Sequence, residues 1–211
     1  MPRLTLPQSY LSEGAPHLLL WRIEESEEAL CRLLPADAGY GEAAARRFKG
    51  AERRLEWLAT RVLFHEAFGP DARITCRPSG RPTVEGATGH ISISHSHRFV
   101  AIATSDYPVG VDIETWTPRA LRVAPRFLSE TEMTLLGNEA ERRAVVLWSA
   151  KECAFKAAEE GTFNVMSEVR LTARPGKTLC ASDKNFQHPQ LVGYIKTDNF
   201  VITYTKKKNT E

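Results

Sequence analysis

The sequence predicts an α+β protein made of two lobes of similar build, each a small antiparallel sheet packed on one long helix. Two observations favour this class. A strand, a helix and a group of strands follow one another before about residue 115, and the same order recurs loosely after it. With 211 residues, 42% of them hydrophobic, the chain can bury a substantial core, as one large domain or two small lobes.

The first half begins with residues 17–24 (HLLLWRIE), which predict a strand. A long helix is predicted over 41–68, because apolar residues such as Leu58 and Val62 recur at helical spacing and Gly69-Pro70 ends it. Three compact extended segments, separated by turn residues, follow at 90–94, 99–104 and 109–113. These three segments predict a small antiparallel meander.

The second half opens with the capping-box pattern SETE, from Ser129 to Glu132, which predicts a short helix reaching Leu136. A longer helix is predicted over 139–160, ended by Gly161. Strand-like segments follow at 168–173, 191–197 and 199–205. This order repeats that of the first half and supports two lobes.

Composition narrows the class of protein. The N-terminus MPRLTLPQSYLSEGAP has no sustained apolar stretch, so we expect an unexported protein with no membrane span. The four cysteines show neither paired nor metal-ligand spacing, which fits a reducing cytoplasm. A net charge of +2 is too small to imply a nucleic-acid partner, although basic residues cluster at 46–54, 119–126 and 206–208.

Two acids lie two residues apart in the stretch GVDIET at 110–115. Side chains at i and i+2 of a strand share a face, so Asp112 and Glu114 present their carboxylates together, away from Val111 and Ile113. Like charges this close are tolerated at a solvated strand end, or where a divalent cation such as magnesium or manganese neutralises them. Taken alone, the stretch from Asp112 to Glu114 favours a strand that ends in solvent.

Another acid and base lie one helical turn apart in LWSAKECAFK. Glu152 and Lys156 share a helix face with Trp148. An ordinary solvated pair would contribute only about 0.2–0.5 kcal/mol, with Trp148 serving the core. The alternative is a site that uses the acid as a metal ligand and the base against a phosphate.

Hydroxyl and imidazole side chains alternate in ISISHSH. Ser92, Ser94 and Ser96 share one strand face, and His95 and His97 the other. The two histidines could bind zinc, but no supporting cysteine or histidine follows, so a phosphate contact or a strand-end cap is favoured. The turn Gly80-Arg81-Pro82 could equally be a basic turn or hold a guanidinium toward an anion.

Taken in order, the pieces GRP, ISISHS, GVDIE and WSAKECAFKA resemble the 4'-phosphopantetheinyl transferase superfamily, whose pattern runs GKP, ISHS, GxDxE and WxxKExxxK. The chain is similar to the two-lobed, surfactin-synthetase-activator type, in which one polypeptide mimics a dimer of short holo-acyl-carrier-protein synthases. This implies lobes 1–115 and 116–211 related by pseudo-twofold symmetry, with the coenzyme A and metal strand in the first, the WSAKE helix in the second and the active site at their interface. A cytoplasmic monomer with holo-acyl-carrier-protein synthase activity, as used in fatty acid biosynthesis, is implied as well.

The resemblance assigns roles to five residues. It implies that Asp112, Glu114 and Glu152 coordinate magnesium, or manganese, against the pyrophosphate of coenzyme A. Glu152 would be the general base for a serine hydroxyl of an apo acyl or peptidyl carrier protein, which attacks the β-phosphate and releases 3',5'-ADP. Lys156 would neutralise the phosphates of the transition state, with Lys151 as the second candidate.

Other residues would bind the nucleotide end. The resemblance implies that Ser94 and His95 contact the 3'-phosphate and adenosine of coenzyme A, with Arg81 where the family has lysine. Further phosphate-binding cations are expected near a helix start, which indicates Arg47 and Arg53, although both could belong to a solvated helix face.

A basic segment just after the metal strand could dock an acidic carrier protein. It contains Arg119, Arg122 and Arg126 with the apolar Leu121, Phe127 and Leu128. A solvated surface is the alternative for these arginines.

Two other classes of function remain as hypotheses. One is a non-catalytic module that binds coenzyme A or a carrier protein, against which the intact set of acids and Lys156 argues. The other is nucleic-acid binding through 46–54, against which the near-neutral charge and the lack of interleaved aromatics argue.

Overall fold

The computed structural model describes residues 14–158, 166–183 and 189–207. In order, its helices and strands are β1 (His17–Arg22), α1 (Glu27–Arg32), α2 (Tyr40–Arg47), α3 (Ala51–Phe68), β2 (Ile74–Cys76), β3 (Pro82–Val84), β4 (His90–Ser96), β5 (Phe99–Ser105), β6 (Val111–Thr115), α4 (Arg119–Val123), α5 (Glu130–Met133), α6 (Ala140–Ala157), β7 (Arg170–Arg174), β8 (Thr178–Ser182), β9 (Gln190–Lys196) and β10 (Phe200–Thr205). All strand pairs are antiparallel, which confirms the α+β class.

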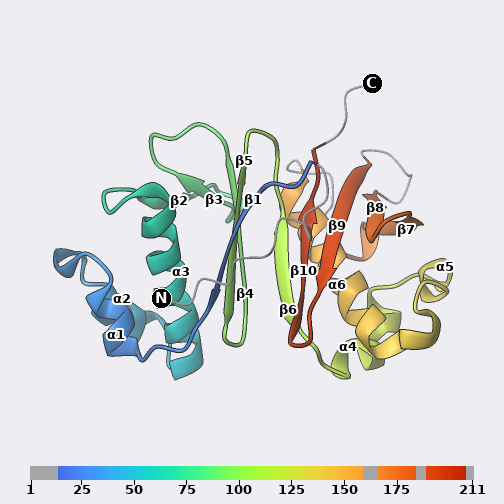
Figure 1. Cartoon of the computed structure of the whole chain (residues 1–211), viewed down its shortest axis with the longest axis horizontal. Coiled ribbons are helices and arrows are strands. Elements are labelled where there is room, and N and C mark those ends of the chain that lie inside the picture. Colours follow the sequence, from blue (N-terminus) through green and yellow to red (C-terminus); the bar gives the residue numbers. More distant parts are fainter. Residues whose placement is uncertain (1–13, 159–165, 184–188, 208–211) are drawn as a thin grey trace.

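The elements form four layers, helix, sheet, sheet and helix (Figure 1). A three-stranded sheet, β1-β5-β4, carries α3 on its outer face, and a five-stranded sheet, β6-β10-β9-β8-β7, carries α6 on its own. Three apolar clusters fill the three spaces between layers, represented by Leu63 under α3, Ile202 between the sheets and Leu147 under α6. Each long helix therefore packs on one sheet, as the sequence predicts.

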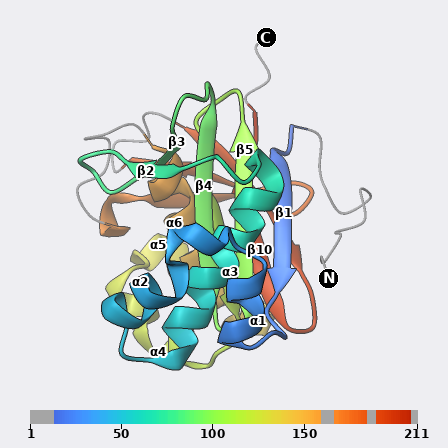
Figure 2. The same cartoon turned by 90° about the vertical axis from the view of Figure 1, so that its left-hand side faces the viewer.

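The helix predicted over 41–68 is two helices. Phe48 takes an extended conformation (φ −130°, ψ 125°) and Gly50 is the residue before α3. Arg54 stabilises the break, because its Nη1 donates to the carbonyl oxygens of Phe48 (3.3 Å) and Lys49 (2.8 Å) while its Nε donates to Glu27 of α1. Helices α1, α2 and α3 thus form one layer over the three-stranded sheet (Figure 2).

The predicted three-stranded meander is wrong in its third strand. β6 pairs with β10, with Ile113 opposite Ile202, and not with β5. The chain crosses from one sheet to the other between β5 and β6, so the carboxylate strand belongs by hydrogen bonding to the second sheet, although the predicted lobes divide after residue 115. The lobe boundaries and the pseudo-twofold relation stay predictions.

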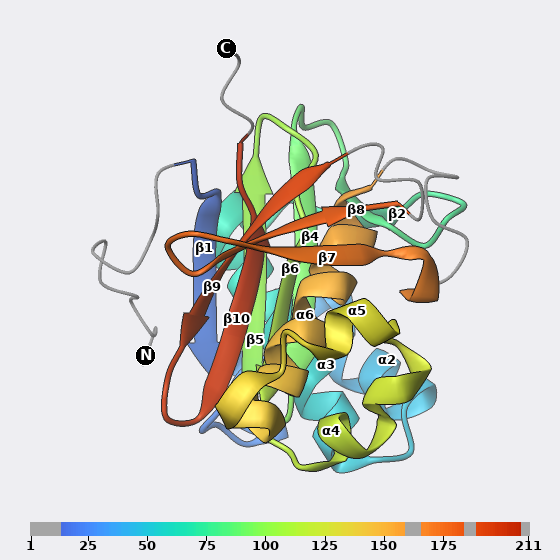
Figure 3. The ribbon, with the colours of Figure 1, turned by 90° about the vertical axis from the view of Figure 1, so that its right-hand side faces the viewer.

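The capping box of the second half is confirmed. Ser129 Oγ accepts from Glu132 N, and Glu132 Oε2 accepts from Ser129 N at 2.8 Å. Helix α6 crosses the outer face of the five-stranded sheet (Figure 3). The helix predicted to reach residue 160 ends at Ala157, because Ala158 is extended (φ −64°, ψ 150°); Gly161 lies outside the described residues.

Five short elements are not predicted from the sequence: α1, α4, β2, β3 and β8. Helix α1 has a polar signal, Ser26, whose hydroxyl accepts from Ala29 N. The hairpin β2-β3 forms one wall of the cavity described below. Over the described residues, no helix is long and apolar enough to cross a membrane.

Candidate functional site

Three serines of β4 join the two sheets. Their side chains share one face, as the alternation in the sequence predicts. Each hydroxyl accepts from a backbone N–H of β6: Val111 N to Ser92 (3.0 Å), Ile113 N to Ser94 (3.2 Å) and Thr115 N to Ser96 (3.3 Å). The serines thereby satisfy the edge of β6 that does not pair with β10, and they hold the carboxylate strand in place.

Gly110 brings the start of β6 against α6. A Cβ at this position would lie 1.9 Å from the carbonyl oxygen of Cys153, so a larger residue would push the strand and the helix apart. Cys153 Sγ donates to the carbonyl oxygen of Gly110 at 3.2 Å. The glycine of GVDIE therefore sets the distance between Asp112 and the helix that carries Glu152.

Asp112 is a buried carboxylate, 4% exposed, with one satisfied oxygen. Its Oδ1 accepts from Ser94 Oγ (2.8 Å) and from Lys156 Nζ (2.7 Å). Its Oδ2 has no hydrogen-bond partner within the part of the chain that the structure describes. Because a buried unpartnered carboxylate oxygen is unfavourable, Oδ2 is suited to a cation or donor from outside the chain.

Ser94 is fully used inside the protein. Its hydroxyl donates to Asp112 and accepts from Ile113 N and from Lys156 Nζ (3.1 Å). One donor and two acceptors are all that a serine hydroxyl has. The predicted contact of Ser94 with coenzyme A therefore has no support in this geometry.

Glu114 and Glu152 flank Asp112 from the strand and from the helix. Glu114 accepts from Ser96 Oγ (2.9 Å) and from Trp148 Nε1 (3.2 Å). Burial, followed by the charge of Asp112, raises the pKa of Glu114, and the same two causes raise the pKa of Glu152. Negative charge is therefore unfavourable here without a compensating cation.

The three carboxylates suit a divalent cation in their chemistry. Oxygen donors are what magnesium and manganese prefer, and the unpartnered Oδ2 of Asp112 and the raised pKa values of Glu114 and Glu152 fit a cluster that lacks positive charge. Across residues 14–158, 166–183 and 189–207, however, no three His, Cys, Asp or Glu side chains are grouped closely enough to hold a metal ion. Metal coordination by Asp112, Glu114 and Glu152 therefore stays a prediction. In this structure the cation paired with Asp112 is Lys156.

A cavity of about 730 Å³ is lined by Glu152 and by Lys156, the ion partner of Asp112. The hairpin β2-β3, the first half of β4 and the end of α6 form its walls. Arg77, Arg81, Lys156 and Glu152 are the charged residues of its lining, three cations and one acid. Its volume is that of a ligand site, and its charge favours a polyanion.

Arg81 ties the hairpin to α6. Its Nη2 donates to the carbonyl oxygen of Phe155 at 3.2 Å, near the C-terminus of the helix, where a cation is favoured. Its position in the cavity wall agrees with the predicted anion site. Arg77, on the same hairpin, was not singled out from the sequence, although CRPSGRP contains both arginines.

Lys151 lies away from the cluster, contrary to the prediction. Its side chain is 0% exposed and forms an ion pair with Glu132 (2.8 Å). Its Nζ also donates to the carbonyl oxygen of Val169 (2.6 Å). Lys151 therefore links α6 to α5 and the start of β7, and it cannot reach a ligand in the cavity.

The two histidines of ISISHSH do not share a face. Strand β4 ends at Ser96, and His97 lies in a left-handed turn (φ 53°) with its Nδ1 2.9 Å from Thr115 Oγ1. His95 instead faces α3, where its Nδ1 lies 3.1 Å from Glu56 Oε2 and 3.3 Å from Arg53 Nη1. His95 and Arg53, each predicted separately as a coenzyme A contact, are therefore neighbours, and this geometry does not bring His95 and His97 together as a zinc pair.

Arg47 is exposed at the end of α2, with its guanidinium 5.6 Å from the ring centre of Phe48. Behind it, Arg61 packs on Trp57, 3.7 Å from the ring centre. Burial, followed by the charge of Arg47, lowers the pKa of Arg61 to about 10. Arg47 is thus placed on a cationic surface, without a contact that assigns it to a ligand.

The predicted carrier-docking segment is only partly available. Arg119, Arg122 and Arg126 are exposed on and after α4. Phe127 and Leu128 are buried in the cluster beneath α6. The surface left for a partner is therefore basic rather than apolar.

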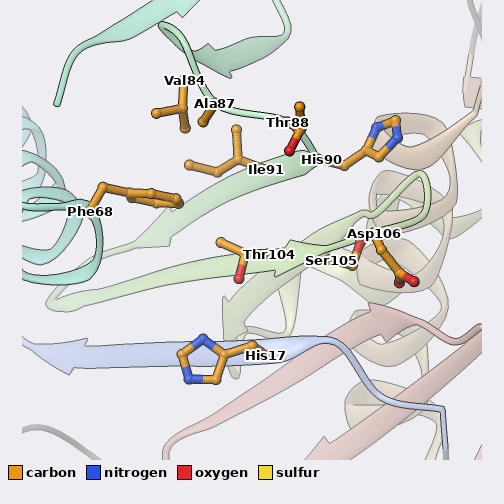
Figure 4. Close-up of a pocket in the computed structure, with 11 residues that line it drawn as sticks. His17, Phe68, Val84, Ala87, Thr88, His90, Ile91, Thr104, Ser105 and Asp106 are labelled. Atoms are coloured by element: carbon orange, nitrogen blue, oxygen red, sulfur yellow. The ribbon is translucent and has the colours of Figure 1, made fainter.

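A second cavity, of about 600 Å³, adjoins the first and shares Gly89, His90 and Ile91 with it. Figure 4 shows Phe68, Val84 and Ile91 on one side and His17 and Thr104 on the other. The described residues that line it include no lysine or arginine. It therefore lacks the fixed positive charge that marks the first cavity.

Part of the chain matches the model of a known protein family. Residues 108–205, which include the carboxylates of β6 and the whole of α6, match the 4'-phosphopantetheinyl transferase superfamily. Similar curated proteins are 4'-phosphopantetheinyl transferase Sfp of Bacillus subtilis (strain 168), 35% identical over 96 residues, gsp of Aneurinibacillus migulanus, 33% over 123, and ffp of Bacillus subtilis, 30% over 148. The matches cover 43%, 54% and 64% of this chain and 43%, 52% and 66% of the relatives. The chain thus spans about half the length of the first two relatives.

Proposed function

We propose, from the premise that this chain belongs to the 4'-phosphopantetheinyl transferase superfamily, that it transfers the phosphopantetheine arm of coenzyme A to a serine of an apo carrier protein. The observation that carries the proposal is the cation-lined cavity beside Asp112, whose buried Oδ2 has no partner among the described residues. The cytoplasm, which holds coenzyme A, is the proposed location, and a monomer is the proposed state.

The cavity would bind the phosphates of coenzyme A. Arg77 and Arg81 present guanidinium groups from the hairpin, and Lys156 an ammonium from α6. Each of the three N–H bonds of Lys156 already has an acceptor: Asp112, Ser94 and the carbonyl oxygen of Val111 (3.2 Å). Transfer therefore requires Lys156 to exchange one of these acceptors for a phosphate oxygen.

The reaction makes one phosphorus–oxygen bond and breaks another. The serine oxygen of the carrier protein attacks the β-phosphorus of coenzyme A, the bond to the bridging oxygen breaks, and 3',5'-ADP leaves with that oxygen. The serine proton must go to a base, and Glu152 in the cavity wall is the proposed acceptor. Because burial and Asp112 raise its pKa, Glu152 holds a proton more tightly than an ordinary glutamate.

Asp112, Glu114 and Glu152 would hold magnesium or manganese. When bound, the metal would supply positive charge to the pyrophosphate and to the leaving group. Without it, the negative charges of the ionised carboxylates would repel the pyrophosphate, because like charges repel.

The exposed arginines Arg119, Arg122 and Arg126 are the proposed docking surface for an acyl or peptidyl carrier protein. Complementary charge raises the rate of encounter with an acidic partner, and screening by salt reduces it. The buried Phe127 and Leu128 have no part in this surface.

The test is the intact mass of apo acyl and apo peptidyl carrier proteins after incubation with this protein, coenzyme A and magnesium. A gain equal to one phosphopantetheine arm, lost with EDTA and with Glu152→Gln, is the expected result. Binding of coenzyme A without any gain in mass on either carrier would instead favour the non-catalytic module.

A further inference from the structure

A buried glutamate of α3 holds an arginine and a histidine side chain together. Glu56 is 4% exposed, and its Oε2 lies 2.9 Å from Arg53 Nη1 and 3.1 Å from His95 Nδ1. The same two nitrogens lie 3.3 Å from each other. Arg53 and Glu56 are one helical turn apart, whereas His95 comes from β4, so the contact joins α3 to the sheet.

The chemistry of the three side chains determines which atoms donate and which accept the hydrogen bonds of this cluster. An ionised carboxylate only accepts, so both Arg53 Nη1 and His95 Nδ1 donate to Glu56. Burial acts to raise the pKa of Glu56, but the hydrogen bonds and charges of His95 and Arg53 outweigh it, and the pKa is lowered. Glu56 is therefore charged at neutral pH and attracts the guanidinium of Arg53 while it accepts from His95.

The cluster lies further along β4, the strand that forms part of the cavity wall. Ile91 and Ile93 line the cavity, and His95 is the next residue on the same strand face, about 7 Å further along at two residues of strand rise. The side chain of Arg53 is 59% exposed and that of His95 35%. The part of each cation that is not bonded to Glu56 can therefore meet a ligand.

We infer that Glu56 is a positioning residue that gathers Arg53 and His95 into one binding pair for a terminal phosphate monoester of the nucleotide. The inference rests on the proposed function, in which the 3'-phosphate of coenzyme A is that monoester. Glu56 itself does not touch the ligand; it acts through the two side chains that it orients.

A positioning role and a simple charge effect predict opposite signs. The negative charge of Glu56 repels a phosphate, so if Glu56 only neutralised its neighbours, removing it would tighten the binding of a phosphate. If Glu56 orients the pair, removing it leaves two long side chains to be ordered by the ligand, and binding weakens.

The experiment is calorimetric binding of adenosine 3',5'-bisphosphate and of adenosine 5'-monophosphate. Wild type is compared with Glu56→Gln, Glu56→Ala and the control Glu52→Gln, an exposed glutamate on the same helix. Glu56→Ala should weaken the bisphosphate about tenfold, the size of one lost charge-assisted hydrogen bond, with Glu56→Gln in between. The monophosphate and the control should change less than about twofold. Equal or tighter binding of the bisphosphate by Glu56→Ala would overturn the inference.

A double-variant cycle guards against a general loss of fold. In the protein with Glu56 intact, Arg53→Gln should weaken the binding of the bisphosphate. In Glu56→Gln the same change should have little further effect, because Arg53 and His95 are no longer held together. Strictly additive losses would overturn the inference, and this comparison holds even if Glu56→Ala does not fold.

Turnover separates this inference from the proposed function. With a carrier protein as acceptor, Glu56→Gln should raise KM for coenzyme A while leaving KM for 3'-dephospho-coenzyme A unchanged. Wild type that binds the bisphosphate but transfers nothing would refute the proposed function, and the calorimetric result would still decide the role of Glu56.

Discussion

Helix α6 carries two lysines, Lys151 and Lys156, and each forms an ion pair with a buried carboxylate. Lys151 meets Glu132 at 2.8 Å with both side chains almost completely buried, 0% and 2% exposed. Lys156 meets Asp112 at 2.7 Å, but its side chain is 28% exposed and it lines the cavity. The two pairs are alike in distance and differ in what surrounds them.

The surroundings separate a structural pair from the pair at the proposed binding site. Both oxygens of Glu132 are used, since Oε1 accepts from Lys151 and Leu171 N and Oε2 from Ser129 N. Asp112 keeps one oxygen without a partner among the described residues. A complete network fixes the packing of α5, α6 and β7, whereas an incomplete one at a cavity leaves a place for a ligand.

The largest effect should come from Lys151. Lys151→Met leaves Glu132 charged, buried and without its ion partner, so the free energy of unfolding should fall by about 3–5 kcal/mol. Lys156→Met is the matched control and should lose less, because Lys156 is itself 28% exposed and Ser94 still donates to Asp112 in the variant. Urea unfolding midpoints of the two variants measure the difference. Equal losses would mean that the two pairs do not differ as the structure indicates.

The next largest effect concerns phosphopantetheine transfer, and here the variant of Lys156 should lose more than the variant of Lys151. Lys156→Met should lower kcat/KM for phosphopantetheine transfer about 100-fold, or about 2.7 kcal/mol, because a cation near the transferred phosphate is lost. The assay is the rate of the mass gain on the carrier protein. A variant as active as wild type would remove Lys156 from the proposed mechanism.

The sequence pattern indicates the pair formed by Lys156 and Asp112 and gives no sign of the pair formed by Lys151 and Glu132. The alternation in GVDIE and the helical spacing in WSAKECAFK correctly placed Asp112 with Glu114, and Glu152 with Lys156. Periodicity states which side chains share a face, but not which face is buried. The resemblance names Lys151 as the second candidate for a phosphate contact, and no local pattern shows that it is buried, because its partner Glu132 belongs to a separate short helix.

Long-range pairing explains the other differences. The partner of β6 is β10, near the end of the described chain, so local signals grouped β6 with its sequence neighbour β5. The three serines of β4 were read as phosphate or capping groups because nothing local reveals that they bind the backbone of β6. Glu56 was missed for the same reason, since an acid three residues after Arg53 is common on helices and its meaning depends on His95.

A smaller effect tests whether Lys151 has any chemical role. Combining Lys151→Met with Glu132→Gln removes both charges, and the amide still offers an oxygen acceptor to the backbone N–H groups. Stability should return to within about 1–2 kcal/mol of wild type, because a neutral pair avoids the unpaired charge. Transfer should then be close to that of wild type. A stable double variant that is inactive would restore Lys151 as a candidate phosphate contact.

The smallest effect is a difference in the sign of the response to acid. Burial acts to raise the pKa of Glu132, but Lys151 and Ser129 outweigh it, so the folded pKa lies below the ordinary 4.5. The ionised Glu132 therefore adds to the free energy of unfolding at pH values above the pKa of an unfolded glutamate. This stabilisation is lost as the pH falls through the lower pKa of folded Glu132.

Glu152 has the opposite sign, because its folded pKa is raised above 4.5. As pH falls through that raised pKa toward 4.5, the folded state takes up a proton before the unfolded state does, and stability increases. In EDTA, urea midpoints between pH 7 and pH 3 should therefore fall less steeply at the acid end for Glu132→Gln than for wild type. Glu152→Gln should lack the increase above pH 4.5. If both variants followed the wild-type profile, neither carboxylate would be coupled to folding, and the contrast between the two clusters of α6 would not extend to their protonation.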